Sequence, residues 1–228
     1  AIPFLLQSAK LLKSYAPESM LLARTYISLA RAFSRNEEYD HALNYYDLVL
    51  KIFKVLGKSE EDDEVISTKT QIASTYLFQQ DNETALKYYT EILETLNKES
   101  LRKGTRSLVQ AQVYKHIGCC YRHQKKFDDA LNSYNKAIEI LTSDFPKDGL
   151  TELASCFGYL AELYSKMGRH KEAIDTHEKK LKLLKKLYPS GVHKKIATTF
   201  EFHGDLLFKS NKTKEGISYL KRAKDILE

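Results

Sequence analysis

The chain of 228 residues carries the same pattern five times. Each copy contains a small residue within a segment such as ALNYY or ALKYY, and these small residues are Ala42, Ala85, Ala130, Ala173 and Gly216. They are separated by 43, 45, 43 and 43 residues, and a second small residue, with a large residue before it and an aromatic or leucine after it, lies upstream of each. A chain built from such copies is expected to fold as an array of similar units that contact their neighbours.

Each copy is predicted to be a pair of helices. Apolar residues recur at spacings of three and four in both halves of every copy, and no segment alternates with the period of a strand. Nine Gly and four Pro are too few for a chain rich in strands and turns, and Gly57, Gly104 and Gly168 fall between the expected helices, with Asp81 as an expected N-cap. The fold class is therefore all-α, with a partial repeat over 1–16 and helix-pair units over 22–57, 65–99, 106–142, 150–187 and 193–228.

The small residues are expected to mark helix contacts. An alanine or glycine where two helices cross lets their backbones approach closely, and a bulky residue three or four positions away fills the space beside the contact. One such pattern carries no information, but five copies in register favour a packing role.

With these residues in view, the chain resembles the tetratricopeptide repeat family. In the third unit the motif residues are Ile117, Gly118, Tyr121, Ala130, Tyr134 and Ala137. The resemblance implies a right-handed α-solenoid, and the period, longer than the usual one of about 34 residues, is similar to that of kinesin light chain adaptors. An armadillo or HEAT array, with a period of about 40–47 residues, is the structural alternative, but the register of the small residues favours the tetratricopeptide repeat.

The resemblance also implies which residues line a concave groove, because the first helix of each unit faces it in this family. The candidate partner-binding residues are Arg24, Arg31, Arg35, Ser74, Lys115, His116, Cys119, Arg122, His123, Tyr159, Glu162, Glu201 and Asp205. The other groove positions hold Ile27, Ser28, Ser34, Ser67, Thr70, Gln71, Leu77, Phe78, Gln112, Ser155, Gly158, Ser165, Lys166, Thr198, Phe202, Phe208 and Lys209.

These candidates predict a groove that is basic over units one to three and acidic at Glu162, Glu201 and Asp205. A peptide with an acidic segment would be oriented by that charge gradient. Chaperone-binding members of the family hold a C-terminal carboxylate with Lys and Asn at two groove positions, of which only Lys115 matches here, so we reject that clamp. The asparagine-rich lining typical of kinesin light chain is also absent.

Metal binding and catalysis are disfavoured. Three cysteines cannot form a disulfide framework and indicate a reducing compartment. His116, Cys119, Cys120 and His123 are metal-ligand types on one helix, but a single helix does not easily supply four tetrahedral ligands. Cys119 has His116 and His123 within a turn of helix, but this is a weak signal for a nucleophile and its base. No phosphate loop, zinc-protease or nucleophile-elbow motif is present. We expect no cofactor, no metal and no enzymatic activity.

The positive charge is uneven. Residues 1–114 have a balance of −1 and residues 115–228 a balance of +7, within a total of +6. The densest basic segment contains Lys171, Lys179, Lys180, Lys182, Lys185 and Lys186. Because these lysines go round the expected helix instead of forming one stripe, a solvated face is favoured over a nucleic-acid surface.

The sequence therefore predicts a non-catalytic scaffold or adaptor that binds a protein, a peptide or a partner helix in the groove. The alternatives are a regulatory domain of a larger enzyme or motor complex, and an accessory module of a ribonucleoprotein. No membrane span is expected, the expected location is cytoplasmic or nuclear, and the chain reads as a fragment of a longer protein. The last helix shows Ile217, Leu220, Ala223 and Leu227, which predicts self-association through an uncapped end.

Overall fold

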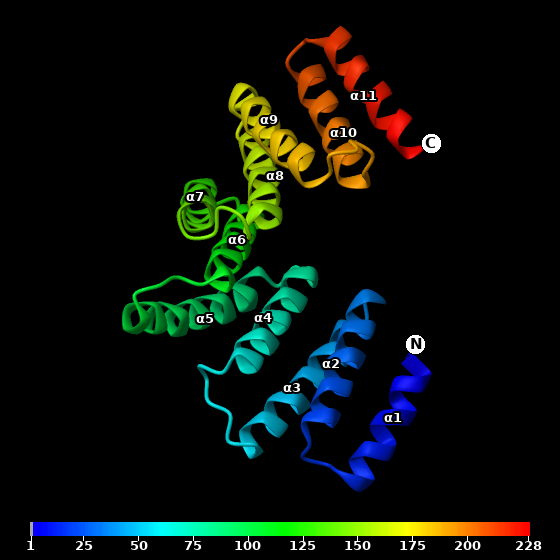
Figure 1. Ribbon diagram of the computed structural model, residues 1–228, viewed down its shortest axis with the longest axis vertical. Coiled ribbons are helices and arrows are strands. Elements are labelled where there is room, and N and C mark those ends of the chain that lie inside the picture. The colour runs from blue at the N-terminus through cyan, green and yellow to red at the C-terminus, as the bar shows by residue number, and fades with distance from the viewer. Residues whose placement is uncertain (1) are drawn as a thin grey trace. The chain divides into compact units, whose positions relative to one another are not determined.

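The structure, a computed structural model, describes residues 2–228, within which eleven α-helices and no strands occur (Figure 1). The expected all-α architecture of consecutive antiparallel helix pairs is thereby confirmed. The chain divides into two compact units, the first ending at Thr105 and the second beginning at Arg106. One repeat domain over residues 1–228 stays a prediction.

The first unit contains five helices. They are α1 (Ile2–Tyr15), α2 (Met20–Arg35), α3 (Tyr39–Val55), α4 (Asp63–Phe78) and α5 (Asn82–Lys103). Helix α2 packs on α3 and α4 packs on α5, while α1 lies against α2 and α3 against α4. Helix α5 runs beyond the predicted end at residue 99 and stops at Gly104, which adopts a left-handed conformation with φ 69°. Apolar side chains from α1 to α4 form one buried cluster.

The second unit contains three helix pairs. They are α6 (Leu108–His123) with α7 (Phe127–Ser143), α8 (Leu150–Lys166) with α9 (His170–Leu187), and α10 (Lys194–Lys209) with α11 (Thr213–Leu227). Helix α7 packs on α8 and α9 on α10, so each pair contacts the next. The N-cap of α6 is a capping box in which Ser107 and Gln110 satisfy each other's backbone N–H groups.

The small residues lie at the helix contacts, as the sequence predicts. Ala42, Ala85, Ala130 and Ala173 are fully buried. A Cβ atom built on Gly118 of α6 would lie 2.6 Å from Cε1 of Tyr134 on α7, which is closer than such atoms approach one another. Glycine at this position therefore makes room for the tyrosine ring.

The two helices of every pair are joined by the same turn. Its left-handed residue is Glu37, Gln80, Lys125, Gly168 or Asn211, with φ between 60° and 74°. In each case the N–H of this residue and the N–H of the next one bond to carbonyls in the last turn of the first helix, as in Gly168 to Ser165 and Arg169 to Tyr164. This pairing is the Schellman motif, and it satisfies carbonyl groups that would otherwise lack partners.

Candidate binding pocket in the second unit

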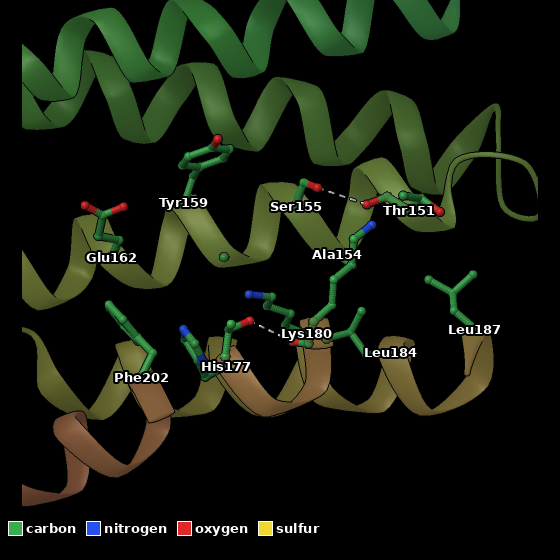
Figure 2. A pocket seen from close by; sticks show the side chains of 13 residues that line it. Thr151, Ala154, Ser155, Tyr159, Glu162, His177, Lys180, Leu184, Leu187 and Phe202 are labelled. Atoms are coloured by element: carbon green, nitrogen blue, oxygen red, sulfur yellow. Dashed lines mark hydrogen bonds between the residues drawn. The ribbon is translucent and has the colours of Figure 1, made fainter. Parts of the chain in front are cut away.

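A pocket of about 360 Å³ lies among α8, α9 and α10 (Figure 2). Its walls combine apolar side chains with hydroxyl, carboxylate, imidazole and ammonium groups, so a ligand there would meet both apolar and polar surface. The lining residues are Thr151, Ala154, Ser155, Gly158, Tyr159, Glu162, His177, Lys180, Leu184, Leu187, Lys195, Thr198 and Phe202.

Two first helices contribute the predicted groove positions to this pocket. Tyr159 and Glu162, together with Ser155 and Gly158, come from α8, and Thr198 with Phe202 comes from α10. Glu201 and Asp205, which were predicted beside them, are exposed side chains outside the lining. The pocket therefore brings together groove positions of two successive helix pairs.

The second helix α9 supplies lining residues that the sequence analysis missed. His177 occupies the position at which Tyr46, Tyr89 and Tyr134 lie in the three preceding pairs, and all four side chains are buried. In those pairs the phenol reaches across to the first helix: Tyr89 Oη lies 2.8 Å from Ser74 Oγ, and Tyr134 Oη donates to Cys119 Sγ at 3.5 Å.

The residue equivalent to Ser74 and Cys119 in the pair α8/α9 is Glu162. The shorter imidazole of His177 forms no hydrogen bond with Glu162 among the residues that the structure describes, and both side chains line the pocket. The position that holds a tyrosine in the earlier pairs therefore holds a shorter histidine here. Open space at this point does not require the histidine, because the corresponding pocket of the first unit is lined by Tyr46.

Lys180 is the cationic group on the α9 side. Its Nζ atom would lie 3.2 Å from a Cβ atom on Gly158, so the missing side chain at Gly158 leaves room for the ammonium group beside α8. Burial and the nearby charge of Lys195 lower the pKa of Lys180. The sequence analysis assigned Lys180 to a solvated face; its five neighbouring lysines are indeed exposed, whereas Lys180 is half-buried.

His177 is 2% exposed and its Nδ1 atom has no hydrogen-bond partner. Its ring stacks on Phe202 of α10 with a centroid distance of 4.6 Å. Burial, with the charge of Lys180, lowers the pKa of His177 to about 3, so the ring is neutral near pH 7. The signal in the sequence was the replacement of an aromatic residue by histidine within the repeat.

Charged groove candidates of α6 pair with carboxylates of α8. Arg122 donates to Glu162, and Lys115 Nζ lies 2.7 Å from Glu152, a partner that the sequence analysis did not consider. Arg122 and Lys115 are each only 8% exposed. Arg122 and Glu162, expected to belong to opposite ends of a charge gradient, thus neutralise each other.

Four other predicted partner-binding residues lie on α6 and α8, the helices that the ion pair of Arg122 and Glu162 joins. The guanidinium of Arg122 lies 6.0 Å from the centre of the Tyr159 ring and 3.1 Å from Nε2 of the exposed His123. Cys119 is buried against Tyr134, and burial lowers the pKa of His116 to about 3. These contacts hold α6 against α7 and α8.

In the first unit the arginine candidates Arg24, Arg31 and Arg35 are exposed on α2. Arg31 lines a second pocket of about 290 Å³, together with the groove positions Ile27, Ser67 and Gln71. Ser74, also a candidate, is hydrogen-bonded to Tyr89.

Neither the thiols nor the acidic groups form a reactive centre in the described part of the chain. Within residues 2–228 no three or more His, Cys, Asp or Glu side chains gather as a metal site would require. Cys119, Cys120 and Cys156 are buried, and burial raises the pKa of Cys120 and of Cys156 to about 12. Both groups are therefore protonated thiols at neutral pH.

No helix between residues 2 and 228 is long and apolar enough to cross a bilayer.

The apolar stripe expected on the last helix, α11, is only partly exposed. Ile217 and Leu227 are 44% and 53% exposed, but Ala223 is buried against the preceding helices.

Helix pairs with alanine or glycine at the contacts, a common Schellman turn and groove positions on the first helices define an α-helical repeat protein of the tetratricopeptide class. Family models described as tetratricopeptide repeat match residues 64–143 and residues 25–52 and 158–187, together more than half of the chain. The chain therefore belongs to the tetratricopeptide repeat family.

Solved structures of the same fold include kinesin light chain-like proteins. BtubC (BKLC) from P. vanneervenii is 19% identical, with a TM-score of 0.78 over 99% of this chain and 87% of that one. A Podosopora anserina protein described as a kinesin light chain with nearly identical TPR-like repeats is 14% identical, with a TM-score of 0.69 over 90% and 94% of the two chains. MamA is 16% identical, with a TM-score of 0.56 over 90% and 91%.

Proposed function

We propose that the chain is a non-catalytic interaction module that binds a segment of a partner protein along the groove-facing sides of its first helices. Tetratricopeptide repeats generally mediate protein–protein interactions. The observation that carries the proposal is the pocket among α8, α9 and α10, where groove positions of two successive pairs line one concavity.

The chemistry of the pocket is that of recognition. Apolar surface from Leu187 and Phe202 adjoins hydroxyl and ammonium donors, so a bound side chain would bury apolar area while its polar atoms keep partners. Arg31 and its neighbours in the first unit offer a second concavity, whose lining also includes the carboxylates of Asp63 and Glu64.

The test uses a partner captured on the immobilised chain, whose bound segment is mapped and then made as a fluorescent peptide. Thr198 is exposed at the rim of the pocket, so Thr198→Trp is expected to fold and to obstruct it. We expect the affinity for the peptide, measured by fluorescence anisotropy, to fall at least about tenfold, which corresponds to about 1.4 kcal/mol.

Thr142→Trp is the matched control, because Thr142 is an exposed residue on α7 outside the pocket. It is expected to leave the affinity unchanged. A mapped peptide that binds the Thr198→Trp variant as tightly as the original chain would contradict the proposal.

Three further proposals concern how this module acts within a larger complex or assembly. Regulation of a larger enzyme or motor complex would use the same pocket, with the partner segment in the same polypeptide or complex. A ribonucleoprotein role would instead use the exposed lysines of α9, and an RNA oligonucleotide would then bind with an affinity that falls steeply with salt. Self-association would use Ile217 and Leu227 on α11.

A further inference from the structure

We propose that the pocket among α8, α9 and α10 holds the carboxylate of an acidic side chain of the partner, with a neighbouring apolar side chain packed beside it. The inference rests on the proposed function, since it names the kind of partner residue that the same pocket would accept. Among the residues that the structure describes, it is carried by a half-buried ammonium without a counter-ion and by a buried imidazole whose Nδ1 atom has no hydrogen-bond partner, both in the lining.

The first step is the charge of the pocket. Lys180 and Lys195 are both in the lining, and no carboxylate within residues 2–228 lies within 4.0 Å of either Nζ atom. The one carboxylate of the lining, Glu162, is already engaged by Arg122 and lies 3.9 Å from Lys166. The lining therefore has an uncompensated positive charge on its α9 and α10 sides, which favours an anion.

The second step is desolvation. Because burial lowers the pKa of Lys180, the charged ammonium is less stable in the empty pocket than in water. A carboxylate placed beside it would restore that stability and would gain a charge-assisted hydrogen bond. The anion would thus be attracted more strongly than by an exposed lysine such as Lys179.

The third step is His177, whose imidazole is buried yet has no partner for Nδ1. Buried polar atoms in proteins nearly always have a hydrogen-bond partner, so an unpaired one in the wall of a pocket indicates a place where a ligand or water completes the site. Figure 2 shows His177 and Lys180 on the same helix, facing α8 across the pocket.

The fourth step separates the kinds of anion. No arginine lines the pocket, whereas a phosphate group is best recognised by the paired donors of arginine. Two lysines and the hydroxyl of Thr151 suit a single carboxylate, whereas the hydroxyls of Ser155 and Thr198 donate to backbone carbonyls. Leu187 offers apolar surface next to the cationic side, which fits an aliphatic neighbour of the acidic residue.

The experiment measures binding of a minimal probe by NMR. The dipeptide N-acetyl-Glu-Leu-amide is titrated into the isotope-labelled chain and compared with N-acetyl-Gln-Leu-amide and with a phosphoserine-Leu analogue. We expect the glutamate probe to shift amide signals of α8, α9 and α10, and the glutamine probe to bind about tenfold more weakly. Equal binding of the glutamate and glutamine probes, tighter binding of the phosphoserine probe, or no shifts with the glutamate probe would overturn the inference.

Two variants locate the site. Lys180→Gln is expected to weaken the glutamate probe about tenfold, and the control Lys179→Gln, one residue away on the exposed face, to leave it unchanged. His177→Tyr restores the residue of the three preceding pairs and removes the unpaired Nδ1 atom, so the probe is expected to bind more weakly while the chain stays folded. An unchanged affinity in Lys180→Gln would contradict the inference even if His177→Tyr does not fold.

The same preparations distinguish this inference from the proposed function. If the dipeptides do not bind but Thr198→Trp still blocks the mapped partner peptide, then the pocket recognises some other side chain and only the inference is lost. If Thr198→Trp leaves the partner peptide bound, the proposed function fails whatever the dipeptides do.

Discussion

Arg122 on α6 donates a hydrogen bond to Glu162 on α8, and this ion pair joins two successive helix pairs of the second unit. The arginine side chain is 8% exposed and the glutamate side chain 34% exposed. The two opposite charges thus neutralise each other. A ligand that binds in this part of the groove would contact an ion pair without net charge.

Replacing Arg122 by methionine is expected to destabilise the fold. The change leaves Glu162 with only the distant Lys166 as a counter-charge, and removing one partner of a buried pair costs several kcal/mol. Because Glu162 keeps some contact with water, we expect a loss of about 1–3 kcal/mol in the free energy of unfolding, measured with urea. In a double-mutant cycle with Glu162→Gln the two losses should not be additive. A loss below about 0.5 kcal/mol would show that the pair is energetically unimportant.

Two glycines inside helices are expected to respond in opposite ways to replacement by alanine. At Gly118 the new Cβ would lie 2.6 Å from the Tyr134 ring, and such overpacking costs about 1–3 kcal/mol, more than the gain of up to about 1 kcal/mol in helix propensity. At Gly158 the nearest atom is the flexible end of Lys180, so Gly158→Ala should leave stability unchanged or raise it by up to about 1 kcal/mol. Thermal unfolding followed by circular dichroism compares the two, and equal effects would contradict this account.

The left-handed residue of each Schellman turn gives a third prediction. Lys125 adopts φ 60°, a conformation that is costly for residues with a Cβ atom. Lys125→Gly is expected to stabilise the chain by about 0.5–1 kcal/mol, and Gly168→Ala to destabilise it by about 1 kcal/mol. Lys125→Ala is the control, because it removes the charge without relieving the backbone. If it stabilises the chain as much as glycine does, the effect is not conformational.

The pH dependence of stability should report on His177. Its folded-state pKa of about 3 lies below the ordinary value of 6.5, so the unfolded chain binds more protons between these values. Its contribution is therefore fully present above about pH 6.5 and is lost as the pH falls toward 3, by at most about 1.4 kcal/mol per pH unit.

His177→Phe is expected to flatten this slope when urea unfolding is repeated between pH 7 and 4.5. The exposed His41→Phe serves as the control, because His41 lies on α3 outside the pocket. A slope that is the same in His177→Phe and in the original chain would contradict the assignment.

Most of the fold was predictable because the repeat is local. Ala42, Ala85, Ala130 and Ala173 marked the helix contacts, and Asp81 caps α5 through the N–H of Thr84 as expected. The end of α5 was not predicted, because four further residues continue the helical pattern up to Gly104. Helix ends depend on such small differences in local free energy.

The site was only partly predictable, because it depends on contacts between helices. Tyr159 and Glu162 were placed in the groove by their register, and both line the pocket. Arg122 pairs with Glu162, and Lys180 lies beside Gly158. Both contacts depend on which side chains reach across from α6 and α9, and helical periodicity does not contain that information. The sequence shows His177 as a departure from the repeat. That its Nδ1 atom has no hydrogen-bond partner among the described residues can be seen only in the packed structure.

The occupant of one repeated position separates the pair α8/α9 from the three before it: histidine instead of a buried tyrosine. Tyrosine and histidine codons differ by a single base, and the exchange leaves the helices, their turn and their small-residue contacts in place. A repeat array can therefore change the chemical groups that line a pocket by a minimal genetic step, without rebuilding the scaffold, and the less regular copies of such an array are where new specificity can arise.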